Sequence, residues 1–288
     1  MIYGLNGEPL STVFDKSGAG LEQAYDVNGN PLIDDKPDLV VMTYNVEWFT
    51  GINANMTMQR SIMEAYEPDI IGWQELQPKS STTLPSALNT LLPDYQHLMG
   101  NFGNKNGFSS KVQMSNFTTV PFRTQANTSA NWDGQSYCTA TINVKGKEIF
   151  VVTAHNTTET LGGREAVNAQ SMEVFEALQG HEYFILLCDL NTVCRSTEHW
   201  QWDGFMKSFY DAGYNIINCV PRDGEFVAIG TFTRSSGNGN WNPNDNIMTS
   251  SNIEIIDFVA DRTQKVAVGL QTGQKIDHIP IIARLKIN

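Results

Sequence analysis

The sequence predicts a layered α/β domain built around a β core. Short apolar or alternating runs, bounded by Gly, Asn, Pro and Asp, recur from Leu39 to the C-terminus, as expected for strands. Segments with helical spacing of apolar residues lie between several of these runs. Hydrophobic residues make up 41% of the 288 residues, which suffices for a packed core and argues against global disorder. Strands and helices mixed in this order favour helices layered on β-sheets.

Seven runs are predicted as strands, several of them buried on both faces because they contain almost no polar residues. They are LVVMTYNV (39–46), DIIGWQEL (69–76), YCTATINV (137–144), IFVVTAHN (149–156), YFILLCDL (183–190), EIIDFVAD (254–261) and IPIIARLKI (279–287). Three segments are predicted as helices: residues 55–67, 83–92 and 163–180. In the third helix, the apolar side chains of Val167, Met172, Phe175 and Leu178 form one stripe.

The first 37 residues differ from the rest and predict a small β-hairpin extension, followed by one main domain over residues 38–288. The segment NGEPL (6–10) recurs as NGNPL (28–32), and the leucines fall every eleven residues. Gly and Asn favour turns, and VFD (13–15) between them is typical of a short strand. We interpret this part either as an edge extension packed on the main domain or as a tether that contacts a larger assembly.

The composition narrows the classes of partner. The chain has 31 acidic and 19 basic residues and a formal net charge of −12, which works against broad electrostatic capture of nucleic acid. The net charge does not exclude a metal-assisted nuclease, because a bound cation reverses the local electrostatic field. No run approaches the roughly 18 apolar residues that span a membrane. The chain as given shows no secretory signal, so we expect a cytoplasmic location by default, with a secreted or virion-associated protein left open, and a monomer.

The cysteines give no sign of a metal or disulfide framework. The four residues are Cys138, Cys188, Cys194 and Cys219, and none of them belongs to a CxxC pair. Cys188 lies within a predicted core strand. We therefore expect reduced, buried or nearly buried thiols and no zinc cluster.

Polar side chains stand at the ends of five predicted strands. They are Asn45, Glu75, His155, Asp189 and Asn191, with Asp277 and His278 just before the last run. Burying an amide without partners costs about 2–7 kcal/mol, so these strand ends are expected to meet at one rim, where sites are usually built. Carboxylates suit Mg²⁺ or Mn²⁺, and histidines suit proton transfer and phosphate stabilisation. The set predicts metal-assisted hydrolysis of a phosphoester.

Six segments, in a fixed order, resemble the endonuclease/exonuclease/phosphatase superfamily, which has the deoxyribonuclease-I-like fold. They are VMTYNVEWF, EPDIIGWQELQ, ATINVKGKEIFVVTAHN, ILLCDLNT, DNIMTSSNIEI and KIDHIPIIARL. The resemblance implies a four-layer α/β sandwich, with two packed and mainly antiparallel β-sheets flanked by helices, here preceded by the short N-terminal β extension. It also implies a divalent cation, either Mg²⁺ or Mn²⁺.

The resemblance further implies roles for individual residues. Three match the family's metal site: Asn45, Glu75 and Asp277. Three match residues that contact the scissile phosphate: His155, Asn191 and His278. Asp189 matches the aspartate that aligns or deprotonates the attacking water. The carboxylate that orients His278 is Asp245, whose segment continues the resemblance, or alternatively Asp257.

Three positions depart from the usual family pattern. Cys188 replaces a glycine, Gln135 replaces an arginine found in many relatives, and Asn156 replaces a leucine. None of these changes removes a core catalytic group. In the Gly/Asn-rich segment 233–245, Trp241 is interpreted either as a stacking platform for a base or sugar, or as a packed residue of an ordinary connector.

These residues predict a divalent-metal-dependent phosphoesterase that hydrolyses its substrate by in-line attack of water. A nuclease-like phosphodiesterase acting on nucleic acid is the preferred interpretation. A phosphatase or phosphodiesterase acting on inositol, lipid or other small phosphates is the first alternative, and a non-catalytic binding module on the same fold is the second.

Overall fold

The computed structural model describes residues 13–15, 36–46, 56–76, 84–101, 106–125, 135–222, 224–232, 242–261 and 278–288. Its strands are β1 (Val13–Asp15), β2 (Leu39–Asn45), β3 (Ile70–Gln74), β4 (Gln96–Met99), β5 (Gly107–Ser110), β6 (Ser115–Pro121), β7 (Ser136–Val144), β8 (Lys147–His155), β9 (Phe184–Asp189), β10 (Asn215–Ile216), β11 (Val220–Arg222), β12 (Glu225–Val227), β13 (Asp245–Thr249), β14 (Ile253–Ala260) and β15 (Ile281–Ile287). The helices are α1 (Met56–Tyr66), α2 (Leu84–Leu91), α3 (Glu159–Leu178), the π-helix η2 (Trp202–Met206) and α4 (Lys207–Asp211).

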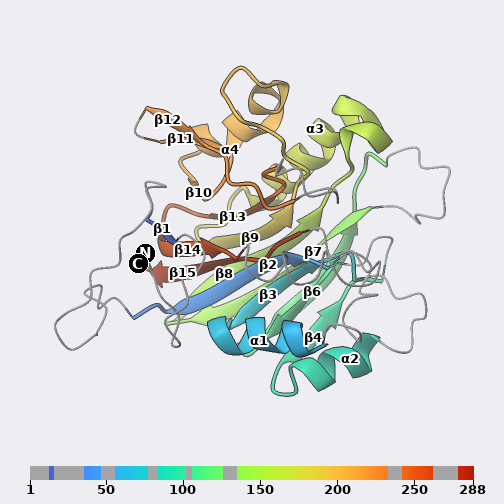
Figure 1. Cartoon of the computed structure of the whole chain (residues 1–288), viewed down its shortest axis with the longest axis vertical. Coiled ribbons are helices and arrows are strands. Elements are labelled where there is room, and N and C mark those ends of the chain that lie inside the picture. The colour runs from blue at the N-terminus through green and yellow to red at the C-terminus, as the bar shows by residue number, and fades with distance from the viewer. Residues whose placement is uncertain are drawn as a thin grey trace.

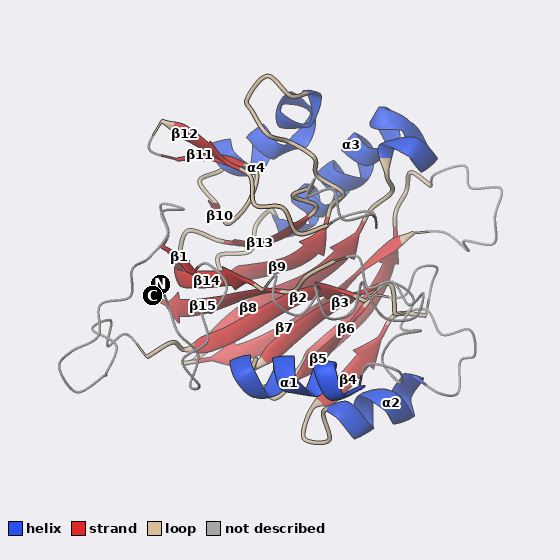
Figure 2. Ribbon diagram, viewed as in Figure 1, coloured by secondary structure: helices blue, strands red, loops and turns tan. Residues whose placement is uncertain are grey.

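Two large sheets pack face to face. The first has the strand order β1-β14-β15-β2-β3-β5-β4 and the second the order β10-β13-β9-β8-β7-β6, with β11 and β12 as a separate small pair. Helices α1 and α2 lie against the first sheet, whereas α3 and α4 lie on the side of the second (Figure 1). The predicted four-layer α/β sandwich is thereby confirmed (Figure 2).

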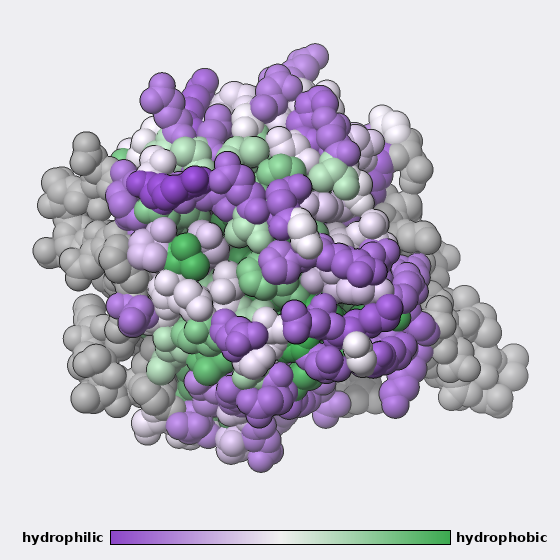
Figure 3. Space-filling model, turned by 180° about the vertical axis from the view of Figure 1, so that it is seen from behind, coloured by the Kyte–Doolittle hydropathy of each residue, from purple (hydrophilic) through white to green (hydrophobic). Residues whose placement is uncertain are grey.

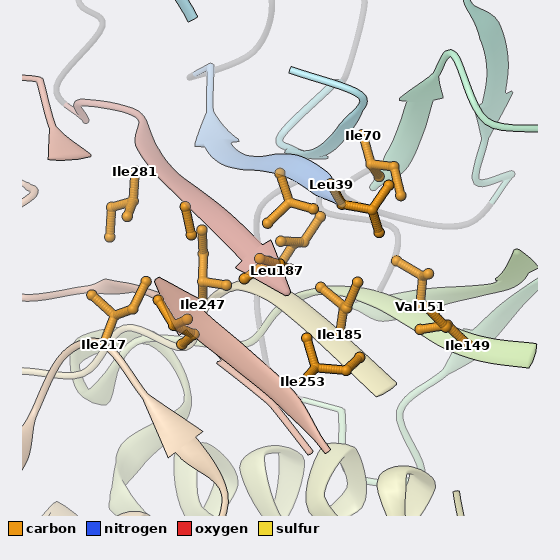
Figure 4. Packing of buried hydrophobic residues seen from close by; sticks show 14 of the residues in the cluster. Leu39, Ile70, Ile149, Val151, Ile185, Leu187, Ile217, Ile247, Ile253 and Ile281 are labelled. Carbon is orange, nitrogen blue, oxygen red and sulfur yellow. The ribbon is translucent and has the colours of Figure 1, made fainter. Parts of the chain in front are cut away.

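Side-chain alternation along the strands builds the layers. In β2, Val41 belongs to the core between the sheets, whereas Met42 and Tyr44 pack against α1 and α2. In β9, Leu187 likewise faces the first sheet and Leu186 faces α3. Because successive side chains of a strand point to opposite faces, strands covered on both sides are continuous apolar runs. Figure 4 shows apolar side chains of the two sheets pointing toward one another.

One parallel strand pair in each sheet places the strand ends that matter for function. All named neighbours are antiparallel except β2 with β3 and β8 with β9. A parallel pair needs a crossover connection, and α1 and α3 provide the two crossovers. As a result, the carboxyl ends of β2 and β3 lie together, and so do those of β8 and β9.

The third helix begins earlier than predicted. Thr158 caps α3 with its side-chain oxygen, which accepts a hydrogen bond from the Leu161 backbone. Gly163, the predicted start, instead lies inside the element with φ 75° and ψ 168°, a backbone conformation almost restricted to glycine. The chain therefore makes one extra helical turn directly after β8 before the amphipathic part of α3.

The N-terminal extension contributes one described strand. β1 pairs antiparallel with β14 and forms the edge of the first sheet, in agreement with the edge-extension interpretation for residues 13–15. The two NGxPL segments lie outside the described residues. The tether interpretation and the boundary at residue 37 therefore stay predictions.

The burial of the cysteines and the polarity of the surface agree with the sequence composition. All four cysteines are buried and free, as expected. Seen from behind, hydrophilic side chains cover much of the visible surface and apolar atoms gather near its middle (Figure 3). Within the described part of the chain, no helix combines the length and apolarity that a membrane crossing requires.

Candidate active site

Three of the predicted residues form one row across the second sheet. His155 ends β8 and is the register partner of Asp189, which ends β9. Asp189 in turn pairs with Asp245, the first residue of β13. His155 and Asp189 share the strand face of Val151 and Leu187, which belong to the core between the sheets. The row therefore points toward the first sheet, at the edge of the sandwich.

The first sheet contributes Asn45 and Glu75 to the same place. Asn45, fully buried at the end of β2, donates a hydrogen bond from Nδ2 to Glu75 Oε1 at 3.1 Å. The same nitrogen lies 2.9 Å from Asp189 Oδ2, on the opposite sheet. Asn45 thus joins the two sheets at the site and holds the Glu75 and Asp189 carboxylates on either side of its amide.

Both histidines lie close to Asp189. His155 Nε2 is 3.6 Å from Asp189 Oδ2 and also 3.6 Å from Glu75 Oε1. His278 Nε2 is 3.6 Å from the same Asp189 oxygen. The Asp189 side chain, 1% exposed, is therefore the point where groups from both sheets converge.

Asp245 is the carboxylate that contacts His278. Nδ1 of His278 lies 2.8 Å from Asp245 Oδ2, a hydrogen bond that directs Nε2 toward Asp189. Burial raises the pKa of Asp245 above its usual value, and the adjacent His278 opposes this shift only in part. Asp257, the alternative from the sequence, instead pairs with Arg284 at 2.8 Å. The geometry favours Asp245.

Asn191 sits beside Asp189 with its side chain fixed at both ends. Its backbone N–H donates to Asp189 Oδ1 at 2.9 Å, as in an Asx-turn, and its φ of 50° is left-handed. Its Nδ2 donates to the Asn156 carbonyl at 2.9 Å, and its Oδ1 accepts from Asn244 Nδ2 at 3.2 Å. One N–H of the amide therefore donates to Asn156, and the amide holds its place next to the Asp189 carboxylate.

The contacts above bring together seven residues at one end of the sandwich, where the strand ends were expected to meet: Asn45, Glu75, His155, Asp189, Asn191, Asp245 and His278. A sequence model of the Endonuclease/Exonuclease/phosphatase family matches residues 42–266. The chain belongs to this family. Endonucleases, exonucleases and phosphatases all hydrolyse phosphoester bonds, and enzymes of this family use divalent metals, so the chain is a metal-dependent phosphoester hydrolase.

Solved structures of the family share the fold at low sequence identity. The endonuclease/exonuclease/phosphatase from Beutenbergia cavernae superposes with a TM-score of 0.65 at 17% identity, over 88% of this chain and 72% of that one. A mannosyl-6-phosphatase from Bacteroides thetaiotaomicron gives 0.59 at 16%, over 86% and 100%. A 3′ phosphatase from Neisseria bound to a product DNA hairpin gives 0.60 at 14%, over 87% and 99%. No curated protein matches the sequence.

The structure adds three residues that the sequence did not single out. Asn244 contacts Asn191, as described above, and Gln201 accepts from the Val193 backbone at 2.6 Å while donating to the Asn191 carbonyl at 3.0 Å. The ring of Phe232 lies 4.7 Å from that of His278. Only Asn244 had a signal in the sequence, because it directly precedes Asp245. The other two come from segments with no family motif.

The three departures from the family pattern are accommodated by packing against α3 and β13. The Gln135 side chain accepts from Gln170 Nε2 at 2.7 Å, inside the protein. Asn156 donates to Ser171 Oγ at 2.7 Å, and the Cys188 thiol lies 3.5 Å from the Asn246 carbonyl. These contacts hold the strand ends of the second sheet, and none of them displaces a predicted site residue.

Two predicted contributors lie outside the described residues: Asp277, assigned to the metal site, and Trp241, the candidate stacking residue. The remaining histidines have local partners away from Asp189. His97 Nδ1 lies 2.8 Å from Ser109 Oγ, His181 stacks on Phe150 at 3.9 Å between ring centroids, and His199 lies beside Trp200. These contacts give the three histidines local packing roles away from the site.

The donor set fits a divalent cation. Asp189, Asp245 and His278 offer ligand atoms within 4.8 Å of one another, and Glu75 adds a third carboxylate. Asp245 Oδ1 and His155 Nδ1 are buried and have no hydrogen-bond partner among the described residues. Carboxylates buried this close together repel one another, and a bound cation offsets that repulsion. Hard oxygen donors of this kind are typical of Mg²⁺ sites.

Proposed function

We propose that the protein is a Mg²⁺-dependent phosphodiesterase of the nuclease type. The observation that carries the proposal is the position of Asp189. Its buried carboxylate is hydrogen-bonded by Asn45 from one sheet and lies 3.6 Å from the imidazoles of His155 and His278. A general base surrounded by donors suited to a phosphoryl group is the arrangement that hydrolysis by water requires.

Asp189 takes the proton from the attacking water. One of its oxygens is held by the Asn191 backbone and the other by Asn45, so its orientation is fixed before substrate binds. A carboxylate fixed in this way acts as a general base without reorganising during the reaction. Burial at the strand end keeps bulk water away from the proton transfer.

The remaining residues stabilise the charge that develops on the phosphoryl oxygens. His155, His278 and the second N–H of the Asn191 amide supply donors, and Asp245 keeps the His278 ring in place. Glu75, Asn45 and Asp277 would hold the cation next to the group of Asp189, Asp245 and His278, and Asp189 and His278 would keep the roles given above. When bound, the cation neutralises charge on a non-bridging phosphate oxygen.

The two catalytic alternatives, a nuclease and a phosphatase or phosphodiesterase on small phosphates, differ in the size of the substrate. The deoxyribonuclease-like segment around His155 and the DNA product on the Neisseria enzyme support a nucleic-acid substrate. The net charge of −12 works against the capture of a polyanion and so favours a small phosphate, such as that named for the Bacteroides enzyme. We place the nuclease first because the segment around His155 resembles the deoxyribonuclease-like members of the family.

The test is hydrolysis of a phosphoester panel with Mg²⁺, Mn²⁺ or EDTA. The panel holds plasmid DNA, an RNA oligomer, bis-p-nitrophenyl phosphate, inositol phosphates and sphingomyelin. Asp189→Ala should abolish metal-dependent cleavage, and Asp257→Asn, at a buried aspartate that pairs with Arg284, serves as the matched control. Cleavage that persists in Asp189→Ala would remove that residue from the mechanism.

Salt dependence separates the substrate classes. Polyanion binding weakens steeply with salt, whereas hydrolysis of a small phosphate changes little. A kcat/KM that falls strongly between low and moderate salt on DNA supports the nuclease. Failure of the wild type on every substrate, with or without metal, would instead favour a binding module on the same fold.

A further inference from the structure

Gln74 lies directly beneath the site and bridges the two sheets. It is the last residue of β3 and is 0% exposed. Its Nε2 lies 3.1 Å from Thr43 Oγ1 on β2 and 3.0 Å from Thr153 Oγ1 on β8. The same nitrogen is 3.3 Å from the Leu187 carbonyl on β9. A single amide therefore contacts one strand of its own sheet and two strands of the other.

Each residue that Gln74 contacts on another strand is the neighbour of a site residue on the same strand face, on the side of the apolar core. Thr43, Thr153 and Leu187 precede Asn45, His155 and Asp189 by two residues on the same strand faces. Thr43 and Thr153 are fully buried, like Gln74 itself. A polar layer thus separates the apolar core from the site, and Gln74 is the side chain that holds this layer together.

The site itself is divided between the two sheets. Asn45 and Glu75, assigned to the metal, belong to the first sheet, while His155 and Asp189 belong to the second. The separation of the sheets at this level therefore sets the distance between the metal side and the proton-transfer side of the site. The sheets also approach closely here, because a Cβ on Gly72 would lie 2.5 Å from Leu187 Cβ.

We propose that Gln74 is a positioning residue for catalysis, which fixes the spacing and register of the two sheets beneath the reacting atoms. The inference rests on the proposed function and deepens it, because it assigns the geometry of that site to a group that touches neither substrate nor metal. The adjacent Glu75, with a left-handed φ of 55°, depends on the same anchor for its position.

Glutamine suits this place because its neutral amide can donate to both sheets. The Thr153 hydroxyl already donates to the Trp73 carbonyl at 3.3 Å, so its oxygen is available as an acceptor. A carboxylate at position 74 could not donate, and would place another negative charge below Asp189. An apolar side chain would leave the Leu187 carbonyl without this donor, and buried groups that lose a partner are unfavourable.

The experiment combines Gln74→Met, Thr153→Val and the double variant, each of nearly unchanged volume. Thr249→Val is the matched control, because Thr249 is fully buried on β13, donates to the Ile253 carbonyl at 2.7 Å and lies at the opposite end of the sheet. The measurements are Tm, kcat and KM on the best substrate of the panel, and calorimetric binding of Mg²⁺ alone and of inorganic phosphate with Mg²⁺.

Loss of supporting contacts around a site typically lowers activity about 10–100-fold, and we expect this fall in kcat for Gln74→Met. KM should rise as well, because the phosphate is bound between the metal side of the first sheet and the donors of the second, and the variant changes the spacing of the two sheets. The double variant should be no slower than Gln74→Met, because both changes remove the same bridge. Thr249→Val should lower Tm but leave kcat unchanged.

Three results would each overturn the proposal. The first is an unchanged kcat in folded Gln74→Met, and the second is a kcat loss in Thr249→Val that scales with its fall in Tm. The third is that the kcat losses of Gln74→Met and Thr153→Val add up in the double variant. If Gln74→Met does not fold, Thr153→Val alone must lower kcat. If the wild type cleaves nothing, the proposed function fails, and the bridge is judged by phosphate binding. Weaker phosphate binding in Gln74→Met with unchanged Mg²⁺ binding supports positioning, whereas equal binding, or no phosphate binding by the wild type, overturns it.

Discussion

Two residues at the site share an unusual backbone. Glu75 and Asn191 follow β3 and β9, and both have left-handed φ values, 55° and 50°. Asparagine adopts this region readily, but glutamate does so rarely, at a cost of about 1–3 kcal/mol. The strain turns each chain sharply at its strand end. In a continued strand the Glu75 side chain would point to the face opposite Gln74, whereas the turn places it within reach of the Asn45 amide.

At the same scale, the Asp245–His278 pair predicts a specific defect. Asp245→Asn replaces the carboxylate that accepts from His278 Nδ1 by a neutral amide, whose NH₂ group can turn toward the ring and hold it in the wrong tautomer for a donor at Nε2. We expect kcat to fall about 10²–10⁴-fold, the range of general acid–base contributions, with a shifted pH–rate profile. Steady-state kinetics on bis-p-nitrophenyl phosphate from pH 5 to 9 would measure it.

The sequence itself supplies the control for this prediction. Asp257→Asn changes the other candidate carboxylate, which pairs with Arg284 on the neighbouring strand. We expect this variant to alter stability and to leave kcat at the wild-type level. A kcat loss in Asp257→Asn that equals the loss in Asp245→Asn would contradict the assignment.

At the scale of elements, the sequence predicted most of the long strands but missed several short ones, including β5 and β13 inside the sheets. The seven predicted runs correspond to β2, β3, β7, β8, β9, β14 and β15, because strands buried on both faces must be continuously apolar. The edge strand β6, with alternating exposed and half-buried residues, carries no comparable pattern. Short β10, β11 and β12 were also missed, since a strand of two or three residues has no measurable period.

The close approach of the sheets can be tested through Gly72. A methyl group there would lie 2.5 Å from Leu187 Cβ and 3.2 Å from Thr153 Oγ1, both on the second sheet. Gly72→Ala should therefore push the sheets apart beneath the site, with a cost of about 1–3 kcal/mol for overpacking and a lower kcat. Urea unfolding and steady-state kinetics would report the two effects.

The control for Gly72→Ala is a glycine at which an added methyl group would have open space around it. Gly146, in the β7–β8 turn, has φ +78° and open space around its Cβ position, so Gly146→Ala should cost stability through backbone strain alone. Its kcat should match the wild type. Equal kcat values in the two variants would show that sheet separation does not matter for catalysis.

Asp38 connects the two sheets at the end of the sandwich opposite the site, and its contacts predict that the stability of the protein depends on pH. Its Oδ2 accepts from the Ile287 backbone at 2.9 Å and from Lys145 Nζ at 2.6 Å. Burial alone would raise the pKa of Asp38, but these two partners lower it by more, so the net shift is downward. The stabilisation is thus complete above the usual pKa of 3.8 and is lost as the pH falls through the lowered value.

We therefore expect Asp38→Asn to be less stable than the wild type by about 1 kcal/mol near pH 7, because it loses the charge but can keep one neutral hydrogen bond. The difference should stay constant down to about pH 5 and shrink below the usual aspartate pKa. Urea unfolding between pH 3 and 8 measures it. A difference that grows on acidification would have the wrong sign for this mechanism.

At the scale of the molecule, the strand ends and their chemistry were predictable, whereas the connections between the sheets were not. Asn45, His155 and Asp189 stand at ends of recognisable runs, so their convergence follows from packed sheets. Phe232 and Gln201 reach the site from segments without periodicity, and only folding reveals them. Gln74 was hidden for another reason, since a single amide inside an apolar run gives no signal until the facing strand is known.

The burial of three carboxylates in one place makes the stability of the whole protein depend on the cation. Glu75, Asp189 and Asp245 lie close together with little solvent to screen their repulsion, so a ligand that binds only the folded state should stabilise it. Mg²⁺ at a hundred times its Kd would add about 2.7 kcal/mol, a rise in Tm of several degrees. Differential scanning calorimetry in EDTA and in a Mg²⁺ series would measure the shift.

Glu75→Gln keeps the hydrogen bond from Asn45 but removes one charge, so its Tm in EDTA should be no lower than that of the wild type, and Mg²⁺ should raise it less. A Tm that ignores Mg²⁺ in both proteins would argue against a cation at this site.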